Sequence, residues 1–82
     1  MNLLDLNIGE EAIIRELKID NSLKFRLQDI GFLKNTKIKV LHSSPSGDPR
    51  AYFIKNTTIA LRNKDAKNII VQKEGEESGR YI

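Results

Sequence analysis

His42 and Asp48 are the two side chains whose types and spacing best suit metal binding or proton transfer. An imidazole nitrogen can ligate Fe²⁺ or Zn²⁺, and a nearby carboxylate can add a second ligand. Two ligands hold such an ion weakly, because protein metal sites generally use three or four. The simpler interpretation is a strand-end histidine bonded to the Ser43–Asp48 loop, with Asp48 capping a turn. We therefore predict no metal site, and a weak dimer sharing an ion stays open.

The residue types that other catalytic sites need are scarce. Among 82 residues there is no cysteine and one histidine, which excludes disulfides, thiolate metal sites and cysteine nucleophiles. Ser43, Ser44 and Ser46 lie near His42, but loops favour serine for turns. Neither a Gly-x-Ser-x-Gly element nor a phosphate-binding glycine loop occurs. We expect a chain that is not an enzyme, has no catalytic residues and uses no cofactor.

Lys34, Lys37 and Lys39 form a basic strip in a chain whose formal charge is 14 − 11 = +3. Such a strip can contact an acidic protein patch or nucleic acid. It can equally keep the exposed face of an edge strand soluble, which is a common use of lysine. We favour the second interpretation, because the aromatic residues that usually accompany lysines in single-strand binding are missing from the strip. No nucleic-acid partner is expected, and the alternative is a small-barrel module that binds nucleic acid or serves as a general protein-interaction module.

One helix is well specified. The cluster Asp20-Asn21-Ser22 supplies side chains that accept hydrogen bonds from free backbone N–H groups at a helix start. Leu23, Leu27 and Ile30 follow at i, i+4 and i+7 and form one apolar stripe, which we expect to cover one end of the core. Gly31 follows the last of them, where a left-handed cap favours glycine. The spacing therefore predicts a three-turn helix.

Short strand-like runs fill most of the remaining sequence. They span Glu11–Leu17, Lys37–His42, Ala51–Lys55, Thr58–Arg62 and Asn68–Gln72. Asn56-Thr57 is spaced as a tight hairpin turn with Asn56 at positive φ, and 63–67 is typical of one helical turn. This order predicts a mainly β fold. We expect a small barrel of about five strands, with one short α-helix after the first strand and a helical turn before the last.

The chain is expected to hold one domain, residues 1–73, and a polar tail, residues 74–82. Glu74–Arg80 contains no apolar residue, so we interpret the tail as mobile. No apolar run approaches the roughly 20 residues that cross a bilayer, and no basic segment precedes an apolar one at the N-terminus. We therefore expect a cytoplasmic protein that does not insert into a membrane.

The motifs, taken in order, resemble the FeoA family of small ferrous-iron transport accessory proteins. They are Leu3-x-Asp5-Leu6-x-x-Gly9, Arg26-Leu27-x-Asp29-Ile30-Gly31-Phe32, Ile38-x-Val40, Pro45-x-Gly47-Asp48-Pro49 and Ile59-Ala60-Leu61-Arg62-x-x-x-Ala66-x-x-Ile69-x-Val71. The resemblance implies an SH3-like β-barrel. It also implies an accessory role beside a membrane Fe²⁺ transporter whose cytoplasmic part is a GTPase.

The sequence departs from the family pattern at two turns. Lys34-Asn35 stands where the family usually has Pro-Gly, and Asn56 stands where it usually has Gly. Both changes place asparagine where a positive φ is expected, a conformation that asparagine tolerates at modest cost. We therefore expect the two turns and the fold to survive.

The partner-binding surface is predicted on and after the helix. Phe25, Arg26, Asp29 and Phe32 would rim a cleft between helix and barrel that accepts an apolar side chain of a partner, as small modules dock with an apolar anchor and a charged rim. Lys37 and Lys39 would add charged contacts. The alternative is that both phenylalanines close the core. A proline-rich peptide is not expected as the ligand, because the aromatic residues are too scattered to form its groove.

Overall fold

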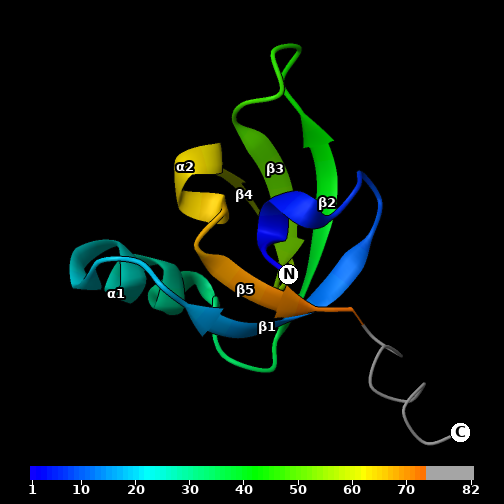
Figure 1. The fold of residues 1–82 in the computed structure, drawn as a ribbon. Coiled ribbons are helices and arrows are strands. Elements are labelled where there is room, and N and C mark those ends of the chain that lie inside the picture. The colour runs from blue at the N-terminus through cyan, green and yellow to red at the C-terminus, as the bar shows by residue number, and fades with distance from the viewer. Residues whose placement is uncertain (74–82) are drawn as a thin grey trace, which may run out of the picture.

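A computed structural model describes residues 1–73, which form five strands, two α-helices and a 3-10 helix. In chain order these are η1 (Leu3–Asp5), β1 (Glu11–Leu17), α1 (Asn21–Ile30), β2 (Lys37–Ser43), β3 (Arg50–Ile54), β4 (Thr57–Leu61), α2 (Asn63–Ala66) and β5 (Ile69–Gln72) (Figure 1). The predicted mainly β fold is confirmed, with its helix after the first strand and its helical turn before the last. The predicted tail lies outside the described residues.

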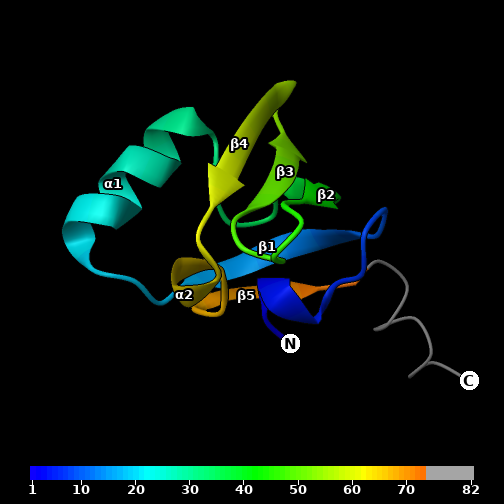
Figure 2. The same ribbon diagram turned by 90° about the horizontal axis from the view of Figure 1, so that it is seen from above.

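The strands form one antiparallel sheet in the order β4-β3-β2-β1-β5, and the sheet curls around a single core (Figure 2). In β1, β2 and β5, alternation directs apolar side chains inward, so in β1 Ala12 and Ile14 are buried while Glu11 is exposed. A bulge at Arg15 shifts the register and brings Leu17 inward. Tyr52 and Phe32 are the largest fully buried side chains of this core.

The N-terminal segment is built into the sheet. The side chain of Asn2 accepts from the backbone N–H of Leu4, and Asp5 accepts from the N–H of Asn2, which together cap η1. The N–H of Val71 in β5 donates to the carbonyl of Met1 at 3.0 Å. Leu3 is fully buried, so the segment closes one side of the core.

Both ends of α1 follow the sequence prediction. The side chain of Asp20 accepts from the N–H of Leu23 at 3.0 Å, and Gly31 (φ 127°) donates its N–H to the carbonyls of Leu27 and Gln28. A Cβ at position 31 would lie 2.7 Å from Cγ of Lys55, so glycine also permits close approach to the β3–β4 turn. Leu27 is the one fully buried residue of the helix, which lies beside the sheet (Figure 2).

The two asparagine turns are confirmed, with φ 73° at Asn35 and 60° at Asn56. The hairpin turn itself is displaced by one residue from the prediction, because it is formed by Lys55 and Asn56 rather than by Asn56 and Thr57. Lys55 also has a positive φ, 51°. A two-residue turn of the type that fits the twist of a hairpin needs a positive φ at both central residues, which explains the displacement.

In the part of the chain described, no helix is long and apolar enough to span a bilayer.

Candidate functional site

The predicted cleft between helix and sheet exists. It has a volume of about 260 Å³ and lies between α1, β4 and the start of α2. Its apolar lining includes Leu23, Leu27 and Ile59, and charged side chains stand at its rim. Arg26 is the residue of the predicted partner set that lines it, facing Arg62 and Asp65 from the other side of the cleft.

The other predicted residues of the helix segment divide between surface and core. Phe25 is 63% exposed on α1, and Asp29 is exposed on the same helix, but neither lines the cleft. Phe32 has no exposed surface and belongs to the core. The prediction that Phe32 lies at the rim of the cleft is therefore wrong, and the alternative, that it closes the core, holds. Phe25 is accessible, as a partner contact requires.

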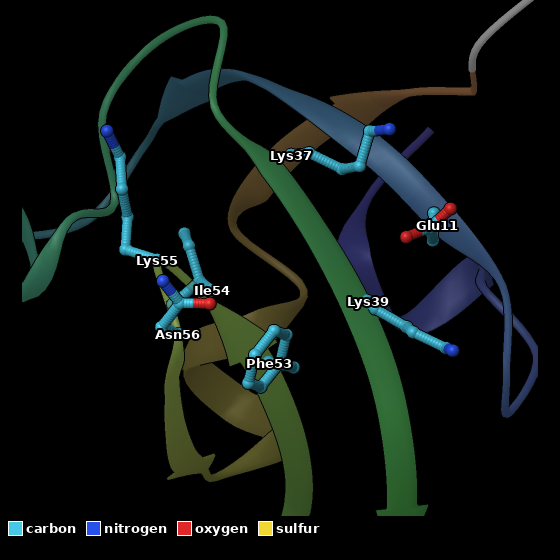
Figure 3. A pocket seen from close by; sticks show the side chains of 7 residues that line it. All are labelled: Glu11, Lys37, Lys39, Phe53, Ile54, Lys55 and Asn56. Carbon is cyan, nitrogen blue, oxygen red and sulfur yellow. The ribbon is translucent and has the colours of Figure 1, made fainter.

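Lys37 and Lys39 belong to a second surface, the basic cleft, on the outer face of β2 and β3. This cleft has a volume of about 210 Å³ (Figure 3). It is lined by Glu11, Lys37, Lys39, Phe53, Ile54, Lys55 and Asn56. Phe53 is 39% exposed and lies opposite Lys39 in the strand ladder, so an aromatic side chain does accompany the lysines. The sequence alone does not reveal this neighbour, because Phe53 belongs to a different strand from the lysines.

His42 is exposed, although strict alternation along β2 would place it on the buried face with Ile38 and Val40. The pairing of β2 with β3 shifts between Val40 and His42, so Leu41 is an extra residue that breaks the alternation. The expected hydrogen bond to the following loop is also not formed within residues 1–73. Across those residues, no group of three or more His, Asp or Glu side chains comes together as a metal site would need.

Asp48 has a structural role at the start of α2. Its carboxylate accepts from the backbone N–H of Asn63 at 3.0 Å, and the Asn63 amide donates to the carbonyl of Gly47 at 3.0 Å. Ser44 reinforces the loop, because its hydroxyl donates to the carbonyl of Asp48 and accepts from the Asp48 N–H. The Asp48-Pro49 bond is cis. The carboxylate therefore joins two loops that are distant in sequence, which is a wider role than the local turn cap we predicted.

Arg50 is a buried cation that the sequence pattern did not reveal. Its guanidinium donates to the carbonyl of Leu4 at 3.2 Å and to that of Leu6 at 2.6 Å, and it lies 5.7 Å from the ring centroid of Tyr52. The Tyr52 hydroxyl is buried without a hydrogen-bond partner among residues 1–73. Burial raises the pKa of Tyr52 above its usual 10.0, although the nearby Arg50 charge acts in the opposite direction.

Glu10 and Lys73 form an ion pair where β5 ends. Nζ of Lys73 donates to Oε2 of Glu10 at 2.6 Å, and both side chains are about one-third exposed. This hydrogen bond, with a second from the backbone N–H of Asn7, lowers the pKa of the Glu10 carboxyl. The pair connects the residue after β5 to the residue before β1.

Comparison with known proteins identifies the family. A family model described as "FeoA domain" matches residues 1–73. "Putative Fe(2+) transport protein A" of Campylobacter jejuni is 37% identical over 71 residues, which are 87% of this chain and 96% of that protein. A "Fe(2+) transport protein A/Fe(2+) transporter FeoB fusion protein" of Porphyromonas gingivalis is 31% identical over 72 residues, which are 88% of this chain and 8% of the fusion protein.

Solved structures share the fold. The solution structure of FeoA from Chlorobium tepidum is 28% identical with a TM-score of 0.88, covering 92% of this chain and 71% of that one. The zinc complex of FeoA from Stenotrophomonas maltophilia, described as a prokaryotic SH3 domain protein, is 26% identical with a TM-score of 0.74, covering 88% and 89% of the two chains. The predicted SH3-like barrel is confirmed.

Proposed function

Because this chain belongs to the FeoA family, we propose that it is a non-enzymatic accessory protein of ferrous-iron transport in the cytoplasm. Its partner is the cytoplasmic GTPase region of a membrane Fe²⁺ transporter. A binding role suits a chain with no cysteine and a single histidine, because such a chain can form neither a thiol site nor a multi-histidine metal centre.

The observation that carries this proposal is the fusion protein of Porphyromonas gingivalis. There, a segment 31% identical to this chain is joined to a protein named as the Fe²⁺ transporter FeoB. Covalent linkage fixes a one-to-one ratio and raises the local concentration of one module around the other to the millimolar range. Such a fusion is useful when the two modules work on each other, so it supports direct association here.

We assign the contact to the exposed surface of α1. Phe25 is the most exposed large apolar side chain of residues 1–73, with Arg26 and Asp29 beside it on the same helix. An aromatic anchor flanked by charges is typical of the centre of a protein interface. On another side of α1, the cleft lined by Leu23 and Ile30 can receive an apolar side chain of the transporter. Lys37 and Lys39 lie on a different face, so they are not needed for a contact at α1.

Binding between the purified full-length chain and the cytoplasmic GTPase region of FeoB tests the proposal. We expect saturable binding by titration calorimetry at physiological salt, with GDP or with a non-hydrolysable GTP analogue. Phe25→Ala is expected to weaken it about 10- to 30-fold, because truncating an interface anchor usually costs about 1.4–2 kcal/mol. The side chain is 63% exposed, so the substitution leaves the core intact.

The matched control is Ile8→Ala, which truncates another exposed apolar side chain. Ile8 lies between η1 and β1, a segment distant from α1 in the fold (Figure 1). The affinity of the Ile8→Ala chain for the GTPase region is expected to stay within twofold of that of the parent chain. Absence of binding in both nucleotide states contradicts the proposed partner, and equal losses for Phe25→Ala and Ile8→Ala contradict the assignment to α1.

A further inference from the structure

Strand β4 forms an open edge of the sheet. It stands last in the order β4-β3-β2-β1-β5, and within the described residues it pairs with β3 alone. The opposite edge, at β5, is covered by the N-terminal segment, because Asn2 bridges Ile70 and the N–H of Val71 donates to the carbonyl of Met1. A strand with an open edge presents unpaired N–H and C=O groups.

The register of the β3–β4 hairpin identifies these groups. The residues that flank a two-residue turn form a hydrogen-bonded pair, and such pairs alternate along an antiparallel ladder. Thr57, Ile59 and Leu61 are therefore bonded to β3. Thr58 and Ala60 direct their backbone groups away from β3, and neither bonds another segment within residues 1–73. Two donors and two acceptors are thus available along the edge.

The sequence of β4 does not protect this edge. Natural sheets usually guard an open edge with charged side chains, proline or a bulge. The five residues Thr57–Leu61 include neither a charged residue nor a proline, and their register with β3 is unbroken. Three of the five are β-branched, which favours an extended, paired backbone. The edge is therefore suited to accept another strand.

Helix α1 lies beyond the same edge and forms the second wall of a cleft (Figure 2). On the β4 side, this cleft is lined by the consecutive residues Ile59, Ala60 and Leu61. Successive side chains of a strand point to opposite faces, so a cleft that contacts three in a row runs along the edge of the strand. On the α1 side, the lining includes Leu23 and Ile30. The free backbone groups of β4 therefore face an apolar side of the helix.

We propose that an extended segment of the transporter's cytoplasmic GTPase region adds to β4 as a further strand and lies in the cleft between β4 and α1. Its backbone bonds the N–H and C=O groups of Thr58 and Ala60, as peptides do when they add to the sheet edge of PDZ and PTB domains. Its residue opposite Ile59 is apolar and points into the cleft, because paired residues share a face of the sheet. The inference rests on the proposed function, since it states the form in which that partner binds.

The charges at the rim of the cleft favour an acidic segment. Arg26 of α1 and Arg62 after β4 carry two positive charges, and Asp65 offsets one of them. An acidic side chain next to the apolar residue complements this excess. A second copy of the chain does not fit, because its own α1 lies beside its own β4 edge and would meet this α1 in the same cleft.

Amide hydrogen exchange of the full-length chain, free and bound to the cytoplasmic GTPase region of FeoB, tests this contact. We expect exchange at Thr58 and Ala60 to slow by about tenfold or more in the complex, because a hydrogen-bonded N–H is protected. The N–H groups of Ile59 and Leu61 are the internal references, since they are already bonded within the hairpin, and their exchange should change less.

Ala60→Pro removes one of the outward N–H groups, and proline is tolerated on edge strands where that group faces solvent. We expect it to weaken binding about 5- to 10-fold, because one backbone hydrogen bond to the partner is lost. Ala60→Ser is the matched control, since it keeps the N–H and a small side chain, and its affinity should stay within about twofold of the parent. The exchange measurement needs no substitution, so it decides the question even where Ala60→Pro does not fold.

The outcomes separate this inference from the proposed function. Binding without slower exchange at Thr58 and Ala60 overturns the strand addition and leaves the transporter as the partner, and so do equal affinities for Ala60→Pro and Ala60→Ser. Absence of binding in both nucleotide states contradicts the proposed function, and the proposed occupant with it. Slow exchange at the two amides in the free chain that is lost on dilution assigns the edge to a second copy and overturns the inference.

Discussion

Tyr52 shows how one side chain can work against the stability of its own core. Its ring is fully buried, yet its hydroxyl has no hydrogen-bond partner among residues 1–73. A buried polar group that loses water without gaining a partner costs about 1–3 kcal/mol. The ring's contact with Arg50, at 5.7 Å from the centroid, needs the aromatic face and not the hydroxyl.

Tyr52→Phe is therefore expected to raise the free energy of unfolding by about 1 kcal/mol at pH 7, because it removes the unpaired hydroxyl and keeps the ring. Urea denaturation measures the change. The parent should also lose stability in alkali. Its folded-state pKa at Tyr52 lies above the unfolded value near 10, so this contribution is complete below pH 10 and is lost as pH rises through the folded-state pKa.

The Tyr52→Phe chain should lack that alkaline loss. Using Tyr81→Phe as the background makes Tyr52 the single tyrosine of the parent, so ultraviolet absorbance follows its ionisation directly. A destabilised Tyr52→Phe chain would mean that the hydroxyl has a partner in solution.

At the scale of elements, local patterns in the sequence were sufficient for β1 and α1. The bounds of β1 match the prediction, since alternation there is interrupted only near its end by the bulge at Arg15. For α1, Asp20 and Gly31 mark both ends through side-chain and backbone chemistry that acts within four residues. The exposure of Phe25 on α1 could also be predicted in part, because Phe25 does not belong to the apolar stripe of Leu23, Leu27 and Ile30.

Features that depend on strand pairing could not be predicted from the sequence. His42 is exposed because an extra residue, Leu41, enters the β2–β3 ladder, and nothing within β2 marks that position. Phe53 joins Lys39 only through cross-strand pairing. The burial of Arg50 depends on carbonyl groups 44 and 46 residues away, and no local rule signals such a contact.

Asp48→Ala tests the connection between the β2–β3 loop and α2. The substitution removes the carboxylate that accepts from the Asn63 N–H at 3.0 Å, so we expect a loss of about 1 kcal/mol in the free energy of unfolding, as for other helix-start acceptors. Thermal and urea unfolding measure it. The control is Asp29→Ala, an exposed position in the last turn of α1, which should show no loss. Equal effects at both positions would contradict a capping role.

At the scale of the whole molecule, Arg50 connects the N-terminal segment to the middle of the sheet. It belongs to β3, and its guanidinium bonds the carbonyls of Leu4 and Leu6, in and just after η1. Because Met1 is also bonded to β5 through Val71, the N-terminal segment is fixed to strands on both sides. The barrel is therefore closed by a buried cation and backbone hydrogen bonds as well as by its apolar core.

Arg50→Met keeps most of the aliphatic volume but leaves the Leu4 and Leu6 carbonyls without their donor. We expect it to lower the free energy of unfolding by about 2–3 kcal/mol, since hydrogen bonds to a charged group contribute more than neutral ones. Urea denaturation measures the loss. Arg62→Met, at an exposed position, is the control and should change stability by less than about 0.5 kcal/mol. Similar values for the two variants would show that the buried guanidinium stabilises nothing.

The hydrogen bond between Met1 and Val71 also sets when the protein can fold during its synthesis. Strand β5 is the last of the described elements to be synthesised, and it pairs with β1 and with the first two residues. A nascent chain lacking β5 has the inner strands but cannot complete the closure. The barrel therefore closes only once β5 has been synthesised, and the apolar strands that precede β5 are exposed to aggregation until then.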